Sequence, residues 1–120
     1  DIDWGSLIWH AHDEARAERL LKVLLAEHFA NPYLPRRLAP LLVDAGFKVV
    51  RSESLVMFNS AIDPYVFGLT KIAGRFVTGR HGITAEDVAA WESDMAALNA
   101  EGGYFFSANQ YIFVAEKPGA

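Results

Sequence analysis

Two histidines near the N-terminus are the residues best suited to chemistry in this sequence. His10 and His12 are separated by one residue in a polar stretch that precedes the start of a helix. An imidazole titrates near neutral pH, so either side chain could take a proton from a phenol or an amine. We favour His10 as the catalytic base because it adjoins Trp9. Solvated histidines are also ordinary in such a loop, and that alternative stays open.

Two carboxylates close to these histidines raise the question of a metal site. Asp1 and Asp3 lie a few residues before His10 and His12, and carboxylate and imidazole ligands suit several divalent ions. Nothing in the spacing fixes the four side chains in one geometry. The sequence therefore predicts no metal ligands.

Aromatic and amide side chains near the expected strand ends form a second group of candidates. They could wall a pocket for an apolar small molecule and orient a polar group on it. For each aromatic ring the alternative is packing in the core, and for each amide it is hydrogen bonding to nearby backbone. Trp91, at helical spacing, is assigned to the core, and Arg36 with Arg37 to a solvated helix start. The candidate substrate-binding residues are Trp4, Trp9, Asn59, Phe105, Asn109 and Tyr111.

The segments that must position these candidates alternate between strand-like and helical patterns. Asp13 and Thr84 are of the type that begins a helix, and Gly46 fits the left-handed position after a helix end. The alternation predicts an α/β fold. The predicted segments are a strand end and loop in residues 1–12, two helices in 13–46, a strand in 47–60, a helical insertion in 61–103 and a closing strand in 104–118.

Four local features carry further structural expectations. The first strand is expected to end at Trp4. The strand in residues 47–58 alternates imperfectly, which favours coverage of both its faces. Residues 107–109 predict an irregularity in the last strand. The second helix begins either at Pro35, with a kink, or just before Pro40, because proline suits only the first turn of a helix.

Composition excludes several classes of protein. The 120 residues suit one domain or part of a larger one, and 52% hydrophobic residues allow a packed core. The net charge of -4 and the lack of basic clusters argue against nucleic-acid binding. The absence of cysteine excludes disulfides and agrees with a cytoplasmic setting. No apolar run approaches the roughly 20 residues of a membrane span.

Three segments, taken in order, resemble parts of a known family. Residues 38–50 have the form L-x-x-L-L-x-x-A-G-F followed by a strand, residues 1–4 look like the acidic-aromatic end of a strand, and residues 104–118 look like a closing strand. This combination resembles the C-terminal half of Rossmann-like, S-adenosylmethionine-dependent methyltransferases related to ubiquinone and menaquinone biosynthesis. The resemblance implies the end of strand five, strand six and an antiparallel strand seven, with the helical insertion as a lid.

The same resemblance implies what this chain does not contain. The family's glycine-rich turn and ribose-binding acidic residue would lie upstream of Asp1, so we expect a piece of a longer protein that binds no cofactor and is inactive alone. The expected partners are an N-terminal half, in the same gene or a second chain, and a small-molecule acceptor. Self-association by strand pairing or swapping is also expected. A non-catalytic module that binds a hydrophobic ligand or dimerises is the alternative function.

Overall fold

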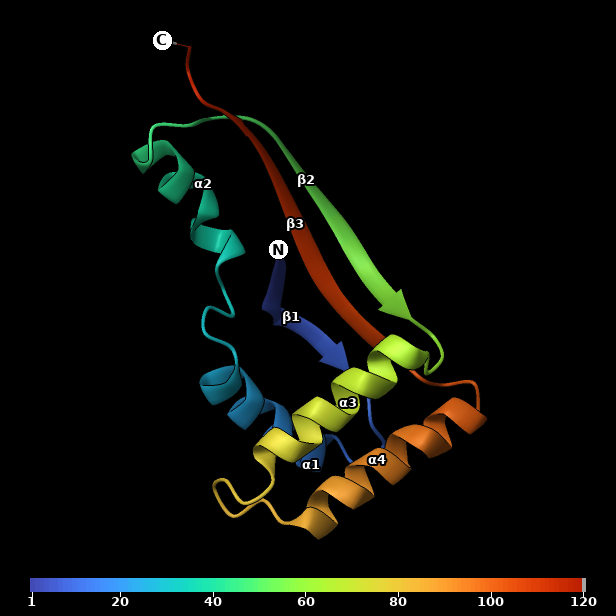
Figure 1. Ribbon diagram of the computed structural model, residues 1–120. Coiled ribbons are helices and arrows are strands. Elements are labelled where there is room, and N and C mark those ends of the chain that lie inside the picture. The colour runs from blue at the N-terminus through green and yellow to red at the C-terminus, as the bar shows by residue number, and fades with distance from the viewer. Residues whose placement is uncertain (120) are drawn as a thin grey trace.

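A computed structural model describes residues 1–119, in which three strands form one sheet and helices pack on it (Figure 1). The α/β class predicted from the sequence is confirmed. No helix within residues 1–119 has both the length and the apolarity needed to cross a bilayer. The elements are β1 (Ile2–Trp9), α1 (Glu14–Val23), the π-helical turn η1 (Leu24–His28), α2 (Pro35–Asp44), β2 (Lys48–Asn59), α3 (Pro64–Val77), α4 (Ala85–Ala100) and β3 (Phe106–Glu116).

The sheet has the order β1-β3-β2, and β3 is antiparallel to both neighbours. The sequence predicts a strand within residues 104–118, and β3 is that strand; its antiparallel pairing agrees with what the resemblance implies. Because β1 and β2 are both antiparallel to β3, they run in the same direction and their carboxyl ends lie at the same end of the sheet. In Figure 1, α1, α3 and α4 gather at that end, whereas α2 lies beside the opposite half of the sheet.

The prediction that the first strand ends at Trp4 is wrong, because β1 continues to Trp9 after an irregularity. Asp3 pairs with Asn109, but Ile8 pairs with Ser107, so β1 has extra residues between these two pairs. Such an insertion is a β-bulge, and it bends a strand without ending it. The irregularity expected in residues 107–109 thus lies in β1, while β3 pairs regularly with β2 across the same residues.

Side chains close the gap that the bulge leaves in the ladder. The Ser6 hydroxyl oxygen accepts a hydrogen bond from the backbone N–H of Asn109 at 2.8 Å. The same hydroxyl donates to the carbonyl oxygen of Asp3 at 2.6 Å. Gly5 is required beside them, because a Cβ on this residue would lie 2.5 Å from the ring of Tyr33. A glycine-serine pair therefore allows the strand to continue.

The expectation that β2 is covered on both faces is also wrong. Val50, Leu55, Val56 and Phe58 are between 45% and 66% exposed. β2 is an outer strand of the three-stranded sheet. The helices leave much of its surface uncovered. The apolar run in residues 55–58 of β2 therefore produces an exposed apolar surface, which is unusual for an isolated domain.

Helix termini follow the sequence closely. The Asp13 carboxylate accepts from the backbone N–H of Arg16, and Thr84 forms a reciprocal capping box at the start of α4. Gly46 has a φ of 92°, as expected after a helix end. Of the two starts considered for the second helix, the structure has the one at Pro35, and the helix continues through Pro40.

The core is centred on aromatic contacts between β1, α4 and β3. The Trp9 ring meets Trp91 and Phe106 edge to face, with centroids 5.1 and 5.2 Å apart. Val66 of α3 and Met95 of α4 are also fully buried. The assignment of Trp91 to the core is confirmed. The helical insertion thus supplies the centre of the core, which differs from the lid expected from the sequence.

Candidate functional site

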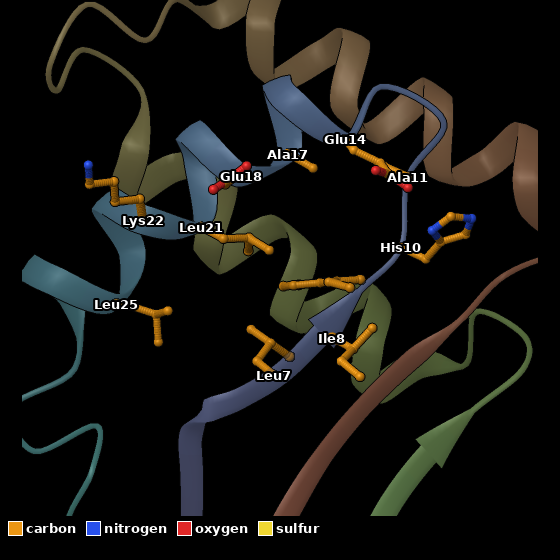
Figure 2. Close-up of a pocket in the computed structure, with 11 residues that line it drawn as sticks. Leu7, Ile8, His10, Ala11, Glu14, Ala17, Glu18, Leu21, Lys22 and Leu25 are labelled. Carbon is orange, nitrogen blue, oxygen red and sulfur yellow. The ribbon is translucent and has the colours of Figure 1, made fainter.

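A groove lies between β1 and α1, near the carboxyl end of β1 (Figure 2). It encloses about 500 Å³. In Figure 2, Leu7, Leu21 and Leu25 surround one end of the space, and Glu14 lies at the other. Residues four apart on a helix share a face, so α1 presents one apolar and one charged row to the groove. The lining residues are Leu7, Ile8, Trp9, His10, Ala11, Glu14, Ala17, Glu18, Leu21, Lys22 and Leu25.

The floor of this groove includes free backbone groups of β1. The His10 N–H donates to the carbonyl of Phe105 at 3.0 Å. Antiparallel pairs alternate between hydrogen-bonded and non-hydrogen-bonded types, so the adjacent pair of Trp9 with Phe106 is of the second type. The N–H and C=O of Trp9 consequently point away from β3, toward the open edge of the sheet. This edge can accept another strand.

His10 lies at the end of the groove, in the loop between β1 and α1. Its side chain is exposed, and Figure 2 shows its ring projecting away from the space between Leu7 and Leu21. An imidazole in this position is accessible to a molecule bound above the carboxyl end of β1. The geometry is therefore compatible with the base role assigned to His10, although the ring does not form the groove floor.

His12 has a different environment. Its Nδ1 lies 2.8 Å from Oδ1 of Asp94, and its Nε2 lies 3.2 Å from Oε2 of Glu101. Burial raises the pKa of Asp94, but hydrogen bonds from the backbone N–H groups of Asp13 and His12 outweigh it, so that this pKa is lower than usual. His12 is thus engaged on both ring nitrogens, which supports the preference for His10.

A second cavity of about 500 Å³ lies on the opposite half of β1, next to α2. Asp3 is only 5% exposed there. Its carboxylate accepts hydrogen bonds from Nε and Nη2 of Arg36 at 2.7 and 3.2 Å, and from the N–H of Gly5 at 2.9 Å. The hydrogen bond to Asp3 raises the pKa of Arg36. Arg36 is exposed at the start of α2, as expected for a solvated helix start, and its side chain also attaches α2 to β1 through Asp3.

Two of the four side chains considered as metal ligands have other partners in the structure. Asp3 already has cationic and amide donors, and His12 has carboxylate partners. Within residues 1–119 no group of three or more acidic or histidine side chains is arranged to hold a metal ion.

The tryptophan candidates pack largely in the core. Trp9 is 3% exposed, and its indole N–H donates to the Tyr104 hydroxyl at 3.0 Å. The Trp4 ring stacks on Phe29 with a centroid distance of 4.5 Å, and the backbone N–H of Trp4 donates to the carbonyl of Pro32. The packing alternative is thus the better description of both rings.

Three of the remaining candidates lie at the start of α3 or at the second cavity. Asn59 donates to the Asp63 carboxylate at 2.8 Å and so supports the cap of α3. The Asp63 carboxylate also accepts a hydrogen bond from the backbone N–H of Val66, and this hydrogen bond is the main reason why the pKa of Asp63 is lowered. Tyr111 lines the second cavity, and Asn109 lies beside it, with its amide 3.4 Å from the Tyr111 hydroxyl.

Phe105 lies beside His10 in the structure although it is distant in the sequence. Its backbone carbonyl accepts from the His10 N–H, and its ring is 39% exposed and 5.0 Å from the Phe58 ring. Of the six substrate-binding candidates, Phe105 and Trp9 are thus the two that adjoin His10, whereas the other four lie elsewhere.

Sequence reasoning missed the charged rim of the groove and the buried aspartates. Glu14, Glu18 and Lys22 recur at intervals of four residues, which is a readable helical signal. The burial of Asp3 and Asp94 depends on α2 and α4 packing beside them, and no local pattern reports this.

Comparison with known proteins adds no relative: no protein-family model, curated protein or solved structure matches this chain. The features that bear on its function are therefore the α/β fold, the groove beside His10 and the open edge of β1.

Proposed function

We propose that the chain is the acceptor-binding, C-terminal half of a cytoplasmic, S-adenosylmethionine-dependent small-molecule methyltransferase, which needs an N-terminal half for activity. The observation that carries this proposal is the position of β3. It lies between β1 and β2 and is antiparallel to both, as the family resemblance implies for strands five, seven and six. The helix α2 precedes β2 at the segment that carries the resemblance, residues 38–50.

The open edge of β1 supports the need for a second half. The N–H and C=O of Trp9 point toward this edge, and a neighbouring strand would pair with them. A sheet extended at this edge would also cover the apolar side chains of Leu7, Leu21 and Leu25. We infer that the N-terminal half docks here, in the same gene product or as a second chain.

The residues of this chain do not fit the cofactor itself. Binding of an adenosyl group in such folds uses a glycine-rich turn from a strand into a helix. Gly79 and Gly82 instead form a tight turn after α3, with φ values of 85° and 77°. The cofactor site is therefore assigned to the N-terminal half.

What this chain would contribute is the acceptor side of the site. Ligands of open α/β sheets bind outside the carboxyl ends of the parallel strands, which here means near the ends of β1 and β2. His10 would take a proton from the acceptor, and Phe105 would contact its apolar part. The protein otherwise acts by alignment and by excluding water.

Calorimetric titration of S-adenosylhomocysteine into the purified 13.3 kDa chain tests this division. No heat is expected. Saturable binding near one per chain would place an adenosyl site in this half and overturn the division. The coding sequence upstream of Asp1 is the complementary test, with a strand and a glycine-rich turn expected. An upstream sequence without them would favour a non-catalytic module.

One observation favours that second candidate, a dimerisation or hydrophobic-ligand module. Ile8 and Phe58 both pair with Ser107 across the sheet, so their side chains share one face with Val56. All three are more than half exposed, and the Phe105 ring extends the patch. Such a patch would favour self-association. Sedimentation at high concentration tests it, and a monodisperse monomer would contradict it.

A further inference from the structure

A carboxylate on α4 holds the loop that carries His10. The Asp94 side chain is 6% exposed. Its Oδ1 accepts the backbone N–H of His12 and its Oδ2 accepts that of Asp13, each at 2.9 Å. Because each oxygen binds a different amide, one side chain fixes two consecutive peptide groups of the loop, residues 10–13. Hydrogen bonds to an ionised acceptor are stronger than neutral ones.

Neighbouring side chains reinforce this contact. The His12 ring lies between the carboxylates of Asp94 and Glu101, at 2.8 and 3.2 Å. From α1, Nη2 of Arg16 donates to Oδ2 of Asp94 at 3.4 Å and to the carbonyl of Ala90 at 3.3 Å. Asp13 also caps α1 through the N–H of Arg16. The same few residues therefore start α1 and attach it to α4.

The loop is held at its other end by the segment that follows α4. The His10 N–H donates to the carbonyl of Phe105, which immediately precedes β3. The loop after β1 is thus fixed on both sides of Ala11, whose side chain is buried. All of these anchors come from α4 and its connection to β3.

We propose that Asp94 is a positioning residue, which sets the place of the His10 imidazole through the backbone of His12 and Asp13. The importance of Asp94 for catalysis rests on the proposed function, but its effect on the position of His10 does not. The proposal makes α4 a fixed part of the site. Movement of α4 away from β1 would break both amide hydrogen bonds and displace His10 together with the start of α1.

Asp94→Asn in the full chain tests the proposal. An asparagine keeps the shape of the side chain but has a single acceptor oxygen, so its NH₂ group must face one of the two amides. The matched control is Glu92→Gln, which also neutralises an acid on α4 but breaks only a contact with Lys71. Amide hydrogen exchange at His12 and Asp13 is measured together with the imidazole resonances of His10, and circular dichroism monitors the fold.

In Asp94→Asn we expect protection of at least one of the two amides to fall about tenfold or more, and the His10 ring resonances to shift. Both readouts should be unchanged in Glu92→Gln. Unchanged His10 resonances in folded Asp94→Asn would overturn the proposal. The unmodified chain provides a measurement that does not depend on folding of the variant: the two amides must exchange more slowly than exposed loop amides, and rapid exchange would also overturn it. Neither readout involves the cofactor, so failure of the methyltransferase proposal would leave this result standing.

Discussion

Replacing Tyr104 with phenylalanine should destabilise the chain through one buried hydrogen bond. Trp9 and Tyr104 are 3% and 2% exposed, and the Trp9 indole N–H donates to the Tyr104 hydroxyl at 3.0 Å. Burial of this hydroxyl raises its pKa, which the hydrogen bond from Trp9 only partly offsets. The substitution keeps the ring and removes the acceptor, so the main change is an indole N–H left without a partner in the core.

A buried donor that loses its partner costs about 1–3 kcal/mol. We therefore expect Tyr104→Phe to lower the free energy of unfolding by roughly that amount, measured from urea unfolding followed by circular dichroism. The control is Tyr65→Phe, because Tyr65 is 51% exposed. A change at such a surface position stays within about 0.5 kcal/mol.

A double-mutant cycle with Trp9→Phe identifies the source of the loss. When the indole is absent, Tyr104→Phe leaves no donor unpaired, so its effect should shrink by about 1 kcal/mol or more. An equal loss with and without the indole would refute the reasoning, because the hydrogen bond would then contribute nothing specific. A loss below about 0.3 kcal/mol in the single variant would refute it as well.

The other predictions concern acid stability, backbone strain and self-association. The pKa of Asp94 is lowered in the folded chain, so the ionised carboxylate stabilises the fold above the unfolded pKa, and this stabilisation is lost as the pH falls through the folded pKa. The urea midpoints at pH 6 and pH 3 should therefore differ less in Asp94→Asn than in the unmodified chain. Gly46 has a φ of 92°, so Gly46→Ala should lower the free energy of unfolding in urea by about 1 kcal/mol. Gly68 lies in α3 with no atom near the position of a Cβ, so Gly68→Ala should raise the free energy of unfolding by about 0.5–1 kcal/mol. A change of the same sign in both variants would contradict the strain argument. Val56→Lys should weaken self-association in sedimentation velocity, and Ser52→Lys on the same strand should not; equal effects would argue against the apolar patch.

The elements that the sequence predicts well are those with local signals. Asp13 and Thr84 bear cap side chains, and Gly46 follows a helix, so each marks a boundary without reference to distant residues. The apolar stripe of α4 has regular helical spacing and is buried, as its period requires. These features depend on the nearest turn of chain, and local spacing is enough to find them.

The course of β1 could not be read in this way. In a regular strand Trp4 and Trp9 would face opposite sides of the sheet, because side chains alternate. The bulge at Gly5 and Ser6 changes the alternation, and both rings contact the same core. The contact that joins the bulge to β3 comes from Asn109, more than one hundred residues away, and the nearby sequence contains no signal for it.

The surroundings of the candidate site could not be predicted for a related reason. Side-chain chemistry makes His10 a candidate, but the groups that hold its loop come from α4 and from Phe105, which precedes β3. The exposed face of β2 was missed because an apolar strand has the same pattern whether a helix or another molecule covers it. Exposure of Val56 and Phe58 is a property of the whole sheet.

Two buried aspartates explain how a three-stranded sheet can present a defined site. Asp3 attaches the first half of β1 to Arg36 of α2, and Asp94 attaches the loop after β1 to α4. A site is most precise when its side chains are held by groups that are themselves fixed, and both carboxylates have at least three hydrogen-bond donors. β1 is thus anchored at both ends while the edge at Trp9 stays open. A strand that pairs with this edge would meet a loop already in position, as the proposed N-terminal half requires.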